Sequence, residues 1–119
     1  MEGATLGGSD AEEARFLRAN GDRGHFAGVN LNRAVLKDAK FCDARMQEVK
    51  GTHADFSGAG LSGATMTNAS LKGALFSGTN FQSTNLCGAY LSEAQGFTFV
   101  QFEAAHTDDR TKSGHAIGD

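Results

Sequence analysis

The 119-residue chain contains no proline, no tryptophan and a single tyrosine. Proline cannot donate a backbone hydrogen bond, so its absence suits a fold in which most amides pair with a neighbouring segment. No apolar stretch approaches the roughly 20 residues that a transmembrane helix requires. The first residues have neither the basic segment nor the apolar core of a signal peptide, and cysteine occurs only twice, which favours a reducing, cytoplasmic compartment.

What the sequence has instead is a period of five residues. Large apolar residues occupy 13 of the 14 positions spaced by five from 26 to 91, and alanine occupies ten of the 15 positions that lie two residues earlier. Such self-similarity is typical of a solenoid built from stacked units. The predicted core consists of Phe26, Leu31, Leu36, Phe41, Met46, Phe56, Leu61, Met66, Leu71, Phe76, Phe81, Leu86, Leu91 and, after one inserted residue near Gly96, Phe97 and Phe102.

A period of five fits neither a helix nor a flat strand, since in both it would distribute the large side chains over all faces. Positions two apart share one side of an extended segment, so Ala54 and Phe56 point together while Asp55 points away. The next two residues, Ser57 and Gly58, suit the tight backbone of a corner. Each unit is therefore a short side followed by a corner, and repeated corners wind the chain into a coil.

Units such as 54–58, 59–63, 69–73 and 74–78, which read small-x-(Leu/Phe/Met)-x-x, resemble those of the pentapeptide-repeat family. The resemblance implies an all-β fold, a right-handed quadrilateral β-helix with four units per coil and about five coils. Residues 20 apart would then stack. The family often has Asn or Asp before the central residue, and Asn30, Asp55, Asn80 and Asn85 match this preference, whereas most other units do not.

The ends of the repeat are less regular. We expect a β-helix over residues 14–111, a mobile or capping segment over 1–13 and a mobile tail over 112–119. A short N-terminal helical cap is the alternative for the start, because residues 9–12 have the form of a capping box. Beyond Gly96, Val100 and Ala105 are expected on the small-residue positions, and residues 105–111 resemble the closing unit of this family's helices.

Gly51 is the one central position that lacks a large side chain. Native interiors rarely leave such a space empty. Met46 lies one unit before Gly51 and Met66 lies one coil above Met46, and methionine is the flexible gap-filler of protein cores. We therefore expect one or both methionines to bend into the vacancy.

No constellation of catalytic residues is visible. The four histidines are scattered, without metal-ligand spacing to a cysteine or carboxylate. Asp38, Asp43 and Glu48 fall on three different sides of the coil, and Cys42 and Cys87 lie two coils apart, beyond disulfide reach. The glycines match neither a phosphate loop nor a dinucleotide fingerprint. The sequence thus predicts no enzymatic activity, cofactor, metal or small-molecule substrate.

Charge bears on which function the resemblance implies. The best-known members are quinolone-resistance and gyrase-inhibitor proteins, acidic rods that mimic duplex DNA and dimerise end to end. Here residues 25–95 contain five acids and six bases, so the rod is not acidic. The bases alternate with acids, which disfavours nucleic-acid binding. We expect a protein-interaction module or scaffold with an unidentified protein partner, and a DNA-mimicking, gyrase-binding protein is the alternative.

One feature at the C-terminal end suggests self-association. Phe97 and Phe102 fit the core columns, so Phe99 is left over beside Val100. These two residues predict a weak end-to-end homodimer contact, unless the C-terminal tail folds over them.

Overall fold

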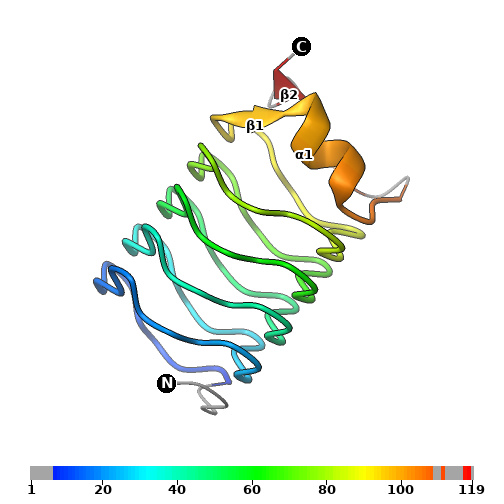
Figure 1. Cartoon of the computed structure of the whole chain (residues 1–119). Helices are drawn as coiled ribbons and strands as arrows, with labels where there is room; N and C mark the ends of the chain where they lie inside the picture. The colour runs from blue at the N-terminus through cyan, green and yellow to red at the C-terminus, as the bar shows by residue number, and fades with distance from the viewer. Residues whose placement is uncertain (1–6, 109–110, 112–116, 119) are drawn as a thin grey trace.

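In the computed structural model, which describes residues 7–108, 111 and 117–118, the chain winds into a solenoid (Figure 1). Isolated parallel bridges join residues 20 apart, from Asp10 with Asn30 to Leu75 with Gln95. Because the repeat has five residues, each coil contains four units. The named elements all lie near the C-terminal end: β1 (Phe97–Thr98), α1 (Phe99–Ala104) and β2 (Ile117–Gly118), with β1 and β2 parallel.

Each corner is a hydrogen-bonded turn. In the unit around Phe56, the Ala59 N–H donates to the Phe56 carbonyl at 2.9 Å, and Gly58 has a φ of 71°. Positive φ at the third residue of a turn is what a type II turn requires, and glycine adopts it without strain. The same conformation occurs at eleven non-glycine residues, from Glu13 to Glu93, at a cost of roughly 1 kcal/mol each.

We expect Glu48→Gly to stabilise the protein by about 0.5–1 kcal/mol, because Glu48 has a φ of 59° and no ion pair among the described residues. Urea unfolding followed by circular dichroism would measure this change. The control is Thr67→Gly, at the second residue of a turn, where φ is not positive, and it should lose about 0.5–1 kcal/mol. Equal losses in both variants would contradict the proposed strain.

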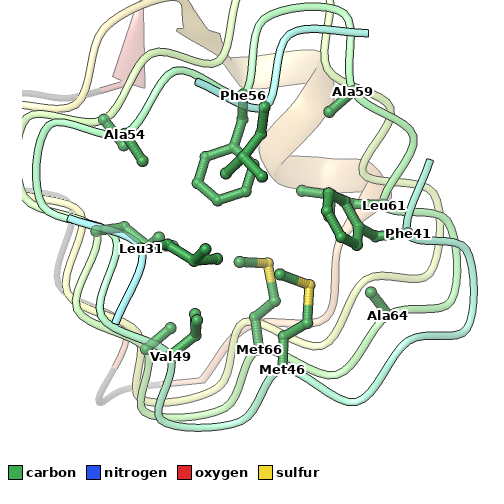
Figure 2. Packing of buried hydrophobic residues seen from close by; sticks show 14 of the residues in the cluster. Leu31, Phe41, Met46, Val49, Ala54, Phe56, Ala59, Leu61, Ala64 and Met66 are labelled. Atoms are coloured by element: carbon green, nitrogen blue, oxygen red, sulfur yellow. The ribbon is translucent and has the colours of Figure 1, made fainter. Parts of the chain in front are cut away.

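The interior is filled by the central residues of the units (Figure 2). All fourteen predicted core residues from Phe26 to Phe97 are buried, with at most 4% of their surface exposed. Phe56 and Phe76, one coil apart, stack with their ring centroids 5.5 Å apart, and Phe76 and Phe97 are 5.6 Å apart. The small residues two positions earlier are equally buried, so the two sets of positions together form one continuous core.

Two threonines replace alanine at the small positions. The Thr79 hydroxyl donates to the Phe56 carbonyl at 2.6 Å, and the Thr84 hydroxyl donates to the Leu61 carbonyl at 2.5 Å. Each hydroxyl thus bonds to the coil below, and the buried polar atom costs little because it is satisfied.

Leu71 and Phe56 lie next to the position where a side chain at Gly51 would begin. A Cβ atom built on Gly51 would lie 2.9 Å from Leu71 Cδ2 and 3.5 Å from Phe56 Cε2, and no methionine atom is among its three nearest neighbours. Met46 and Met66 lie parallel and point into the interior (Figure 2). The leucine one coil above and the next phenylalanine along the chain therefore lie nearest to this Cβ position, and the bending of a methionine into the rest of the space stays a prediction.

The N-terminal part also differs from the prediction, since the coil is already present before residue 14 and the described residues there contain no helix. The Gly8 N–H donates to the Ala27 carbonyl at 2.8 Å, and the Glu13 N–H donates to the Asn32 carbonyl. The Asp10 carboxylate accepts from the Glu12 N–H instead of capping a helix. Pairing with the coil above outweighs the local helical signal, because it satisfies more backbone groups.

At the C-terminal end, one residue is inserted into the coil, and a helix forms where a further coil was predicted. The last bridge joins Asn85 to His106, a separation of 21. Between them lies α1, which begins with a reciprocal capping box between Thr98 and Gln101. Phe102 packs on Phe97 from this helix, at 5.9 Å between ring centroids, and Val100 is 74% exposed rather than on a small-residue position.

Candidate functional site

The absence of a catalytic centre stays a prediction, and the described residues show where the ionisable side chains lie. Among residues 7–108, 111 and 117–118, no group of three His, Cys, Asp or Glu side chains could hold a metal ion. Asp38, Asp43 and Glu48 occupy three successive corners, each at positive φ, and so project from different sides of the coil. No described helix is long and apolar enough to span a membrane.

The two cysteines, Cys42 and Cys87, are free thiols, and both are partly buried. Burial of Cys42, and next the nearby Asp22 carboxylate, raise the pKa of its thiol above the ordinary value. The Cys42 N–H donates to Asp22 Oδ1 at 2.8 Å. A raised pKa keeps the thiol protonated at neutral pH, which makes Cys42 a poor nucleophile.

Polar residues before the central position stabilise the corners. In six units the side chain of an Asn or Asp accepts from the backbone N–H two residues later, at 2.9–3.1 Å. Asp22 and Asn32 accept instead from amides one coil above. These side chains therefore have structural partners in the backbone. The six side chains that accept from the N–H two residues later are those of Asp10, Asn20, Asn30, Asp55, Asn80 and Asn85.

Comparison with known proteins identifies the fold family. The model for pentapeptide repeats matches eight copies, over residues 1–38, 30–68, 54–93 and 69–106. The chain belongs to the pentapeptide-repeat family. No curated protein sequence matches it.

Three solved structures are similar to this pentapeptide-repeat chain. One is a pentapeptide repeat protein from the thylakoid lumen of Arabidopsis thaliana (29% identity, 78% of this chain and 68% of that chain, TM-score 0.43). A second is Rfr23 from the cyanobacterium Cyanothece 51142 (18%, 92% and 88%, TM-score 0.56). A third is QnrB1, a plasmid-mediated fluoroquinolone resistance protein (16%, 99% and 77%, TM-score 0.51). The last two likenesses show the fold, a right-handed β-helix solenoid.

Charge divides this solenoid into two parts. Residues 7–55, which we call the charged half, contain eight acids and eight bases, whereas residues 56–92, the neutral half, contain only Lys72. The corners follow the same division. In the charged half, eight corners at positive φ carry an ionisable side chain, whereas five corners of the neutral half are glycines. The charged half therefore retains charge at positions where glycine would cost less.

Near the C-terminal end, side chains bond to backbone groups of the last described coil. Gln101 Nε2 donates to the carbonyls of Phe76 and Thr79, both at 2.9 Å. Asp108 Oδ1 accepts from the Gly88 N–H at 3.0 Å, and the Thr111 hydroxyl donates to the Leu86 carbonyl. Within the predicted closing unit 105–111, Asp108 and Thr111 thus bond to the coil, and residues 109–110 lie outside the described residues. The contribution of α1 to this end was not predicted, although Thr98 and Gln101 have capping-box spacing.

Val100, one of the two residues in the predicted end-to-end contact, is exposed on α1. The side chain of Phe99 lies outside the described residues. The contact itself stays a prediction.

We expect Gln101→Ala to destabilise the protein by about 1–2 kcal/mol, because two coil carbonyls lose their donor and the helix loses its capping partner. Thermal unfolding would measure the loss. Glu103→Ala, an exposed position on the same helix, should change stability by less than about 0.5 kcal/mol. Similar effects of the two substitutions would show that Gln101 does not close the coil.

Proposed function

We propose that this protein is a non-enzymatic protein-interaction scaffold, a four-sided rod of about five coils whose charged half binds a protein partner. The observation that supports this is the run of ionisable side chains held at strained corners, among them Arg18, Asp38 and Glu48. Strained backbone is often retained where it serves function. The β-helix holds such side chains on a rigid grid, which reduces the entropy lost on binding.

The proposed location is the cytoplasm. It is supported by the two unpaired thiols, Cys42 and Cys87, which would persist in a reducing compartment. Cell fractionation with antibody detection would test it, and recovery in an oxidising compartment would contradict it.

The second candidate, a DNA-mimicking protein that binds gyrase, has the fold shared with QnrB1 in its favour. Duplex DNA carries one negative charge per about 1.7 Å of its axis. In this protein the eight acids of the charged half are balanced by eight bases, and the neutral half has no acid at all. Its surface therefore does not reproduce the charge of a duplex, and the scaffold is favoured.

The experiment is affinity capture from the source cell with two matched variants. Asp38→Gly/Asp43→Gly/Glu48→Gly removes three corner charges without backbone strain. Ser57→Gly/Ser62→Gly/Thr67→Gly removes three neutral side chains. We expect a partner that the wild type and the neutral variant capture and the corner variant loses. Equal capture by both variants would contradict the proposal, and strong inhibition in a gyrase supercoiling assay would favour DNA mimicry.

A further inference from the structure

The charged half and the neutral half of the solenoid differ in backbone strain. In the charged half, eight corners hold a non-glycine residue at a φ of 56–63°. In the neutral half only Asn68 and Ser83 adopt this conformation, which asparagine tolerates better than most residues, and the other five corners are glycines. The strained residues of the charged half are Glu13, Arg18, Arg23, Arg33, Asp38, Asp43, Glu48 and His53.

The core is also weaker in the charged half. Three of its nine central positions lack a large side chain, whereas all eight central positions of the neutral half have one. The three are Ala11, Gly21 and Gly51. The neutral half has in addition the buried hydrogen bonds from Thr79 and Thr84 to the coil below.

Contacts between aromatic rings follow the same division. Among the described residues, the rings of the charged half form a single pair, Phe26 with Phe41, at 5.5 Å between centroids. The rings of the neutral half are linked to one another and to the ring of the following coil. The linked rings are those of Phe56, Phe76, Phe81 and Phe97, with neighbouring centroids 4.9–5.6 Å apart.

The two halves meet at an interface between consecutive coils. There the Leu36 N–H donates to the Asp55 carbonyl at 2.8 Å, and the Met46 N–H donates to the Thr65 carbonyl at 2.7 Å. In a solenoid each coil contacts only its neighbours, so stability is approximately a sum over units and interfaces. Opening of the charged half would break this interface and release the strain of eight corners, while Phe56 keeps its stacking partner, Phe76.

We propose that the charged half opens and closes as one cooperative unit while the neutral half stays folded. Regions of lower local stability open in this way in many proteins. A consequence rests on the proposed function: a partner that binds the corner charges selects the closed form, so its apparent affinity is reduced in proportion to the closed fraction. The opening itself needs no partner.

The test is native-state hydrogen exchange of the full chain without a partner, followed by NMR at low urea concentrations. The amides of Phe26 and Leu31 are compared with those of Leu61 and Leu71, which are similarly buried and bonded at similar lengths, 2.6–2.9 Å. The charged-half amides should exchange at least about tenfold faster. Their exchange should depend less on urea, because partial opening exposes less surface than complete unfolding.

Two variants separate this behaviour from unfolding of the whole chain. Gly78→Ala introduces strain at a neutral-half corner with a φ of 71°, where the new Cβ atom meets nothing closer than 3.9 Å. It should accelerate exchange in the neutral half by roughly fivefold to thirtyfold and leave the charged half unchanged. Glu48→Gly should slow exchange in both halves about equally, because opening of the charged half is part of complete unfolding. The NMR spectrum reports whether each variant is folded.

Equal exchange in the two halves of the wild type, or faster exchange in the neutral half, would overturn the proposal. A Gly78→Ala variant that accelerates both sets of amides equally would also overturn it, because the solenoid would then unfold as one unit. Failure to capture a protein partner would count against the scaffold function and would leave the exchange result unchanged.

Discussion

Phe76→Ala should destabilise the protein by about 3–5 kcal/mol, the range for a buried phenylalanine. Phe76 is fully buried and packs against three other rings, with centroids 5.5 Å from Phe56, 5.1 Å from Phe81 and 5.6 Å from Phe97. Its removal leaves a cavity bounded by three rings that belong to three coils. Because each coil contacts only its neighbours, the neighbouring coils cannot collapse far into it.

Urea unfolding followed by circular dichroism measures this loss. Since small domains are stable by roughly 5–15 kcal/mol, the variant should lie close to unfolding in buffer. Lys72→Ala, at an exposed corner of the neighbouring unit, is the matched control and should change stability by less than about 0.5 kcal/mol. A loss below about 1 kcal/mol for Phe76→Ala would contradict the packing described here.

Ala64→Leu should cost about 3 kcal/mol, the upper part of the usual range for overpacking. Ala64 is fully buried between Ala44 in the coil below and Thr84 in the coil above, which are also fully buried, since bridges join the next residue, Thr65, to Arg45 and to Asn85. Adjacent coils pair at strand spacing, about 4.8 Å. Thr84 donates to the carbonyl of Leu61, only three residues from Ala64. No direction is open for the added side chain.

Thermal melting compares Ala64→Leu with Ala27→Leu, which places the same side chain at an outward, half-buried position. The second variant should melt within a few degrees of the wild type. If Ala64→Leu also melts within a few degrees of the wild type, the interior is not closed around the small residues.

The core could be predicted from the sequence because the large apolar residue at every fifth position is the side chain that each unit buries. Leu61 and Phe76 repeat the same environment along the chain, so each unit supports the prediction for the others. Gly51 shows where this reasoning ends. The sequence revealed a vacancy, but which of Leu71, Phe56, Met46 or Met66 fills it depends on rotamers in three dimensions.

The ends were harder because they break the period. Residues 9–12 have the local pattern of a helix start, yet they are part of the first coil of the solenoid. The reason is that the second coil offers backbone partners to Gly8 and Glu13. Residues 99–104 fit the phase of the repeat after one insertion, yet they form α1, which a capping box between Thr98 and Gln101 starts and from which Gln101 donates to two coil carbonyls.

The sequence by itself determined the family, the five-residue unit, the buried side chains and the division into a charged and a neutral half, because each depends on a repeat or a composition that needs no coordinates. Only the tertiary structure decided how the two ends differ. Backbone groups where the repeat is interrupted have no partner defined by it, so their pairing depends on nearby segments: Gly8 and Glu13 donate to the second coil, whereas near the C-terminal end Gln101 donates to the carbonyls of Phe76 and Thr79.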